Sequence, residues 1–152
     1  MEKAKIQSLR ALIKICQELR GEGKSIGLIT GCFDIIHYGH INLLSFAKKK
    51  VDVLIIGVDN DKTLRLNKGV GRPVFGETAR ARVLAEMVSA DYVFINPQTL
   101  QYQDPEVNLY YEKITKKLGV TALITNSRAD PHWREKQNLD HSDSWHPPLP
   151  LV

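Results

Sequence analysis

The amino-acid sequence predicts an α/β fold with one open, parallel sheet and helices on both of its faces. Short apolar runs alternate with amphipathic runs as far as Asn126, which is typical of strands and helices that follow one another in a parallel sheet. The run at 51–58 is apolar except at Asp52 and Gly57, so it fits a strand buried on both faces. The stretch between the runs at 25–30 and 51–58 has the length of one right-handed crossover helix.

The first part of the chain is predicted to contain two helices and two strands. Apolar residues at helical spacing indicate a helix over 6–19, and Gly21 supplies its stop signal. The short apolar run at 25–30 indicates the first buried strand. A second helix over 39–50 then leads directly into the strand at 51–58.

The alternation continues after this strand, with two polar loops between the elements. Asp59 to Asp61 can cap a short helix through Leu66, and a basic loop that contains glycines follows at 67–73. The Lys and Arg of this loop suit either a surface connection or a functional loop on a rigid scaffold. The later elements are a helix at 77–88, a strand at 91–95, a helix at 106–118 closed by Gly119, and a strand at 120–124.

Length and composition place the chain among ordinary folded domains. Of its 152 residues, 43% are hydrophobic and 25% charged, and we expect one domain over 1–139 with an irregular tail over 140–152. The sequence shows no bilayer-length apolar run and no secretory signal, so we expect a cytoplasmic protein with no membrane partner. Cys16 and Cys32 are expected to be reduced thiols. The net charge of +4 suits an anionic small molecule as well as nucleic acid.

The clearest functional signal lies between Gly31 and His40, where a predicted strand turns into a predicted helix. The segment reads Gly-Cys-Phe-Asp-Ile-Ile-His-Tyr-Gly-His, so His37 and His40 stand three residues apart. Free backbone N–H groups and the helix dipole favour an anion such as phosphate at a helix N-terminus. Imidazole groups add donors that can follow negative charge as it develops. The turn is therefore predicted to bind phosphate.

Two other kinds of chemistry are compatible with these residues. A metal ion could be held by His37 and His40 with Cys32 or Asp34, but no second ligand pair stands at a recognised zinc spacing. Cys32 could act as a nucleophile because a helix N-terminus lowers a thiol's pKa, although no base can be assigned to it. P-loop and GxGxxG patterns are absent from the sequence, which argues against a P-loop NTPase and a dinucleotide dehydrogenase. We expect no metal ion held by the protein itself.

The segment 31–40 resembles the GxFDxxHxGH signature of the cytidylyltransferase-like nucleotidyltransferases, which use an HxGH motif. The resemblance implies their Rossmann-like fold and covers about the first two-thirds of the chain. It is closest to the heptose-phosphate adenylyltransferase branch, and less close to glycerol-3-phosphate cytidylyltransferase. The further matching segments are Gly57-Val58 followed by Asp61, Lys68-Gly69 with Arg72-Pro73, Arg80, and Ala90-Asp91-Tyr92-Val93.

The resemblance also implies roles for individual residues. His37 and His40 would stabilise the pentacoordinate transition state as an acceptor oxygen attacks the α-phosphate of a nucleoside triphosphate and pyrophosphate leaves. Lys68 and Arg80 would neutralise phosphates and complete the catalytic set, while Asp34 would chiefly orient the turn. The residues implied to contact the nucleotide are Gly31, Cys32, Phe33, Asp34, Gly39, Asp61 and Arg72.

The implied reaction transfers AMP, in preference to CMP, from ATP or CTP to a phosphorylated sugar or polyol. Mg²⁺ would be bound mainly through the triphosphate, and a homodimer is expected. This sequence departs from the family in two segments. Where family members carry a Gly-Gly-Asp or Gly-Asp-Asp turn, it has Thr125 to Asp130, in which Ser127 and Arg128 are candidates for part of the role of that turn. The Ser-Thr-Thr or Ser-Ser-Thr run of the family does not occur before Val152. A nucleotide-binding module with little or no catalysis is therefore the alternative hypothesis. Nucleic acid is not an expected partner, because the chain lacks a basic stripe with interleaved aromatic residues.

Overall fold

The structure of the protein is a computed structural model that describes residues 4–124. The predictions for Ser127 and Arg128, the domain boundary after residue 139 and the tail at 140–152 lie outside the described residues. Within residues 4–124, none of the helices has the length and apolar character needed to span a membrane.

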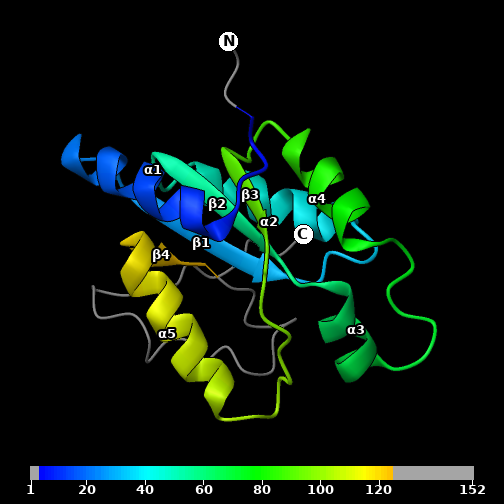
Figure 1. Cartoon of the computed structure of the whole chain (residues 1–152). Helices are drawn as coiled ribbons and strands as arrows, with labels where there is room; N and C mark the ends of the chain where they lie inside the picture. The colour runs from blue at the N-terminus through cyan, green and yellow to red at the C-terminus, as the bar shows by residue number, and fades with distance from the viewer. Residues whose placement is uncertain (1–3, 125–152) are drawn as a thin grey trace.

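Helices and strands alternate along the described part of the chain, as the sequence predicts (Figure 1). The helices are α1 (Leu9–Gly21), α2 (Tyr38–Lys48), α3 (Asp61–Lys68), α4 (Glu77–Ala85) and α5 (Glu106–Leu118). The strands are β1 (Ile26–Gly31), β2 (Val53–Val58), β3 (Tyr92–Ile95) and β4 (Ala122–Leu123). Every element predicted within these residues is present, and the α/β class is confirmed.

The four strands form one parallel sheet in the order β3-β2-β1-β4. β1 and β2 pair over their full length, from Ile26 opposite Val53 to Gly31 opposite Val58. β1 lies between β2 and β4, so the direction in which the chain adds strands reverses at β1. Ligands of such sheets bind beyond the carboxyl ends of the strands at this reversal. The end of β1 at Gly31 is therefore the position where a ligand site is expected.

Helices cover both faces of the sheet (Figure 1). α2 and α4 pack on one face around a core that includes Leu44, Ile56 and Leu84. α1 and α5 pack on the other face around a core that includes Leu12 and Ile55. Successive side chains of β2 thus pack into the cores on opposite faces of the sheet, and Ile55 and Ile56 are both fully buried. This double burial explains why the sequence of the strand is an unbroken apolar run.

The first helix begins later than the sequence predicts. Ile6 forms a parallel bridge with Val93, and Gln7 N donates to Val93 O at 2.9 Å. Ser8 then caps α1, because its Oγ accepts a hydrogen bond from Ala11 N at 3.2 Å. Residues 5–7 therefore run extended along the edge of the sheet. Apolar spacing alone does not reveal such a pairing with a distant strand.

Candidate active site

The chain leaves the carboxyl end of β1 through a strained residue, Phe33. Its φ is 49°, in the left-handed region that non-glycine residues rarely adopt and that costs conformational energy. The Phe33 side chain is buried in the core that α2 and α4 share. Its ring centroid lies 5.3 Å from that of His40. Burial of the ring thus anchors the turn next to the second histidine of the motif.

The two histidines cap the first turn of α2. His37 is the N-cap residue, and its Nδ1 accepts a hydrogen bond from Gly39 N at 3.1 Å. His40 reaches back so that its Nδ1 accepts from His37 N at 3.2 Å, and the two ring centroids are 4.0 Å apart. Because Nδ1 is the acceptor in both rings, a neutral ring carries its proton on Nε2. Each ring therefore has an Nε2–H donor for an anion at this helix N-terminus.

Gly39 provides the space that the His37 ring occupies. A Cβ atom at this position would lie 3.0 Å from His37 Cε1 and 3.1 Å from His37 Nδ1. A larger residue would therefore displace the ring or break its hydrogen bond. The glycine of the HxGH motif serves the cap geometry, since it allows the first imidazole to fold over the helix terminus.

Burial and two neighbouring groups lower the pKa of His40. Desolvation of the ring is the largest cause, and the charges of His37 and Lys68 act in the same direction. His40 is therefore neutral at pH 7, as an Nδ1 that accepts a hydrogen bond requires. Lys68 is the last residue of α3, so the end of this helix brings a cation to the histidine pair.

Replacement of Lys68 by Met is expected to raise the pKa of His40, because the imidazolium form then no longer faces this cation. An NMR titration of the imidazole ¹⁵N shifts measures the change. Lys62→Met is the matched control, since Lys62 is an exposed lysine of the same helix and its loss should leave the titration unchanged. An identical His40 titration in Lys68→Met and the wild type would contradict the electrostatic contact.

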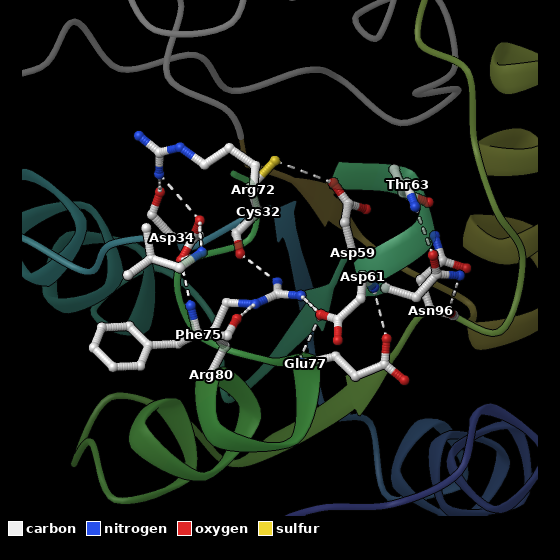
Figure 2. Close-up of polar contacts among 12 residues, drawn as sticks. Cys32, Asp34, Asp59, Asp61, Thr63, Arg72, Phe75, Glu77, Arg80 and Asn96 are labelled. Carbon is white, nitrogen blue, oxygen red and sulfur yellow. Dashed lines mark hydrogen bonds and ion pairs between the residues drawn. The ribbon is translucent and has the colours of Figure 1, made fainter. Parts of the chain in front are cut away.

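Asp34 fixes the turn to the loop that precedes α4. Its side chain is 0% exposed and accepts hydrogen bonds from Val74 N at 2.9 Å, Phe75 N at 3.1 Å and Arg72 Nη1 at 3.0 Å. Figure 2 shows the Arg72 and Phe75 contacts on either side of this carboxylate. Burial alone would raise the pKa of Asp34, but the hydrogen bonds from Val74, Phe75 and Arg72 outweigh it and the pKa is lowered. Asp34 is therefore a buried, ionised anchor of the turn.

Arg80 lies beneath the turn with a side chain that is only 1% exposed. Its Nη1 donates to Cys32 O at 2.5 Å, and its Nε donates to Phe75 O at 2.8 Å. Its Nη2 donates to Asp61 Oδ1 at 2.8 Å, so the guanidinium is directed at three protein acceptors (Figure 2). The family resemblance implies that Arg80 neutralises phosphates. The structure places this charge under the turn, where it holds the backbone.

Asp59 and Tyr102, which the sequence analysis does not assign to the site, lie against Cys32. Tyr102 Oη donates to Asp59 Oδ2 at 2.5 Å and lies 3.1 Å from Cys32 Sγ. Burial raises the pKa of the Cys32 thiol and Asp59 raises it further, which disfavours the nucleophilic thiolate. Asp59 can be found in the sequence as the first polar residue after a buried strand, at the edge where ligands bind. No comparable signal marks Tyr102.

Most of the predicted site residues come together at the end of β1. Those that form or border the turn are Gly31, Cys32, Phe33, Asp34, His37, Gly39, His40 and Lys68. Arg72 and Arg80 contact the turn from the loop and from α4, and Asp61 is joined to it through Arg80. Over residues 4–124, no three His, Cys, Asp or Glu side chains are grouped as a metal site would require.

The site thus consists of two histidines at the N-terminus of the helix that follows the first strand of an open parallel sheet, an arrangement suited to binding a phosphate group. The family described as cytidylyltransferase-like matches residues 28–143, a range that includes the histidine turn and all the elements from β1 to β4 apart from the first residues of β1. The chain belongs to the cytidylyltransferase-like family, and the predicted membership of this family is confirmed.

Three curated relatives share the name bifunctional protein HldE. The protein of Desulfatibacillum aliphaticivorans is 42% identical to this chain over 92 residues, that of Geobacter metallireducens 41% over 92 residues, and that of Rhodopseudomonas palustris 47% over 78 residues. The alignments cover 60%, 60% and 51% of this chain. They cover only 19%, 19% and 16% of the relatives, so the chain corresponds to about a fifth of their length.

A solved structure has the same fold. The lipopolysaccharide core biosynthesis protein from Thermoplasma volcanium matches this structure with a TM-score of 0.55 and 23% sequence identity. The superposition covers 80% of this chain and 94% of that chain. This similarity confirms the predicted Rossmann-like architecture.

Proposed function

We propose that the enzyme transfers the AMP group of ATP to a phosphorylated sugar or polyol and releases pyrophosphate. The observation that carries the proposal is the pair of imidazole rings whose Nδ1 atoms are both held by backbone N–H groups at the N-terminus of α2, those of the N-cap residue His37 and of Gly39. Donors that are fixed in this way need no reorganisation when charge develops on a phosphoryl group. The preference for ATP over CTP rests on the resemblance of the loop at 68–73 to the adenylyltransferase branch.

The proposed reaction is an in-line displacement at the α-phosphorus of the triphosphate. An oxygen of the acceptor phosphate forms a bond to this phosphorus, and the bond to the bridging oxygen breaks so that pyrophosphate leaves with the electron pair. His37 and His40 donate to α- and β-phosphate oxygens, and Lys68 neutralises the leaving group. The acceptor phosphate is already an anion at neutral pH, so the protein need not remove a proton. Catalysis consists of positioning and electrostatic stabilisation.

Mg²⁺ is proposed to arrive with the triphosphate, whose hard oxygen atoms it prefers as ligands. When bound, the ion neutralises charge on the phosphates. Two carboxylates beside the turn, Asp34 and Asp61, are each paired with an arginine, which fits an ion held chiefly by the nucleotide. The homodimer and the cytoplasmic location stay predictions from the sequence.

A matrix of nucleoside triphosphates against sugar, polyol and vitamin phosphates tests the proposal, with pyrophosphate release as the readout. ATP with a sugar or polyol phosphate is expected to release pyrophosphate and to give a product that contains both AMP and the acceptor. Release with CTP in place of ATP would change the assigned base. Binding of ATP in calorimetry, without release across the whole matrix, would favour a nucleotide-binding module.

A further inference from the structure

We propose that Asp61 is a positioning residue for the histidine turn and acts by holding the Arg80 guanidinium against the Cys32 carbonyl. The inference rests on the proposed nucleotidyl transfer, and it assigns Asp61 a task other than contact with the nucleotide. Three segments that are distant in the sequence meet at this guanidinium: the end of β1, the start of α3 and the loop before α4 (Figure 2).

Asp61 supplies the counter-charge of a buried cation. Its Oδ1 accepts hydrogen bonds from Arg80 Nη2 at 2.8 Å and from Glu77 N at 2.7 Å. The Asp61 side chain is 26% exposed, whereas that of Arg80 is 1% exposed. A buried guanidinium is stable only when it is paired and hydrogen-bonded. The orientation of Arg80 therefore depends on Asp61.

Glu77 fixes Asp61 in the place where it can hold Arg80. Glu77 Oε2 accepts from Asp61 N at 2.6 Å, so the first residues of α3 and α4 cap each other. The N-cap residue of α4, Gly76, makes no side-chain cap of its own. Because α4 also carries Arg80, this reciprocal cap sets the position of the carboxylate relative to the guanidinium. Acidic side chains are favourable at helix N-termini, so the arrangement is stable without substrate.

The other two hydrogen bonds of Arg80 hold the turn itself. The guanidinium binds the carbonyl of Cys32 in the turn and the carbonyl of Phe75 in the loop. Phe75 N donates in turn to Asp34 Oδ1 at 3.1 Å. The turn is thus held at residue 32 by Arg80 and at residue 34 by the loop. Phe33, whose strained backbone supports the second histidine, lies between these two attachments.

Asp61→Ala is expected to lower kcat for pyrophosphate release by about 10²-fold, which is the scale of loss when reacting groups are displaced by about 1 Å. The KM for the triphosphate is expected to change less, because the N–H groups of α2 remain. Asp61→Asn keeps an Oδ1 acceptor and is expected to restore most of the kcat. Arg80→Lys cannot reach three acceptors at once, so its kcat is expected to fall as in Asp61→Ala.

The carbonyl ¹³C resonance of Cys32 gives a readout that does not depend on activity. The chain has 2 cysteines, so labelling with [1-¹³C]cysteine gives one signal from the turn and one from Cys16 in α1. In Asp61→Ala and Arg80→Lys the Cys32 signal is expected to shift and the Cys16 signal to stay. If Asp61→Ala fails to fold, Arg80→Lys and Asp61→Asn carry the test.

Asp104→Ala is the matched control, because it removes another carboxylate that accepts a hydrogen bond from the first backbone N–H group of a helix. Asp104 Oδ1 accepts from Glu106 N at 3.0 Å, and its loss should change neither kcat nor the Cys32 signal. An unshifted Cys32 carbonyl in Asp61→Ala and Arg80→Lys would overturn the proposal, and so would wild-type kcat in Asp61→Ala. If the wild type transfers no nucleotide to any acceptor, the proposed function fails, while a shifted signal still supports the link from Asp61 to the turn.

Discussion

His37→Asn and His40→Gln are each expected to lower kcat for pyrophosphate release by roughly 10²–10³-fold, the scale for loss of one oriented donor, while α2 stays capped. Asn is a favourable N-cap residue, and Gln at the third helical position completes a capping box. The acceptors for Gly39 N and His37 N are therefore retained in these variants. What is lost is an Nε2–H donor. Initial rates of pyrophosphate release measure the effect, and thermal unfolding verifies the fold.

Ser8→Ala is the control for loss of a helix cap without loss of an imidazole. Ser8 caps α1 through Ala11 N, and α1 packs on the opposite face of the sheet from α2. This variant should lose about 1 kcal/mol of unfolding free energy and keep the wild-type kcat. Turnover close to that of the wild type in His37→Asn or His40→Gln would show that the rings only cap the helix.

Asp34→Ala is expected to reduce the free energy of unfolding by about 2–4 kcal/mol, because removal of a buried acceptor leaves two backbone donors without partners. These donors are the N–H groups of Val74 and Phe75, whereas Arg72 Nη1 loses its ion pair and keeps a 2.7 Å hydrogen bond to Asp34 O. Urea unfolding measures this loss. The urea concentration at the midpoint of unfolding should fall, while the slope of the unfolding free energy against urea concentration should stay the same. Activity should fall as well, since the attachment of the turn to the loop is removed. A loss as small as that of Ser8→Ala would contradict this role of the carboxylate.

The contribution of Asp34 is also expected to depend on pH. The folded-state pKa of Asp34 is lowered, so the carboxylate stabilises the folded protein at pH values above the unfolded pKa, which is about 3.9. This stabilisation is lost as the pH falls from there through the folded pKa. The difference in unfolding free energy between the wild type and Asp34→Asn should therefore shrink below about pH 4. If the difference in unfolding free energy between the wild type and Asp34→Asn is the same at pH 7 as in strong acid, Asp34 is not ionised in the folded protein.

The parts of the fold that local signals determine could be predicted from the sequence. The helix expected over 106–118 is α5 with the same bounds, and Gly119 ends it with a left-handed φ of 63°. The start of α1 could not be predicted in this way. Ile6 continues the apolar spacing of the helix, but its backbone pairs with Val93, which is 87 positions away. A pairing over this distance leaves no periodic trace near Ile6.

The histidine turn could be predicted because its residues are contiguous and of an unusual type, whereas the side-chain directions around it could not. Arg80 has the charge expected of a phosphate-binding residue, yet its partner Cys32 is 48 positions away. Tyr102 meets Asp59 across 43 positions from within a polar loop. A sequence shows which groups are available, but contacts at such separations depend on how β1, β2 and the loops are brought together.

The extended segment before α1 covers the outer edge of β3. β3 is an outer strand of the sheet as described over residues 4–124, and open strand edges are sites where other chains add by backbone pairing. Val93 N donates to Lys5 O and Gln7 N donates to Val93 O, both at 2.9 Å, so this segment occupies the edge. Removal of residues 1–7 would expose the Val93 backbone and allow sheets of different molecules to join. We therefore expect this segment to act against aggregation of the protein.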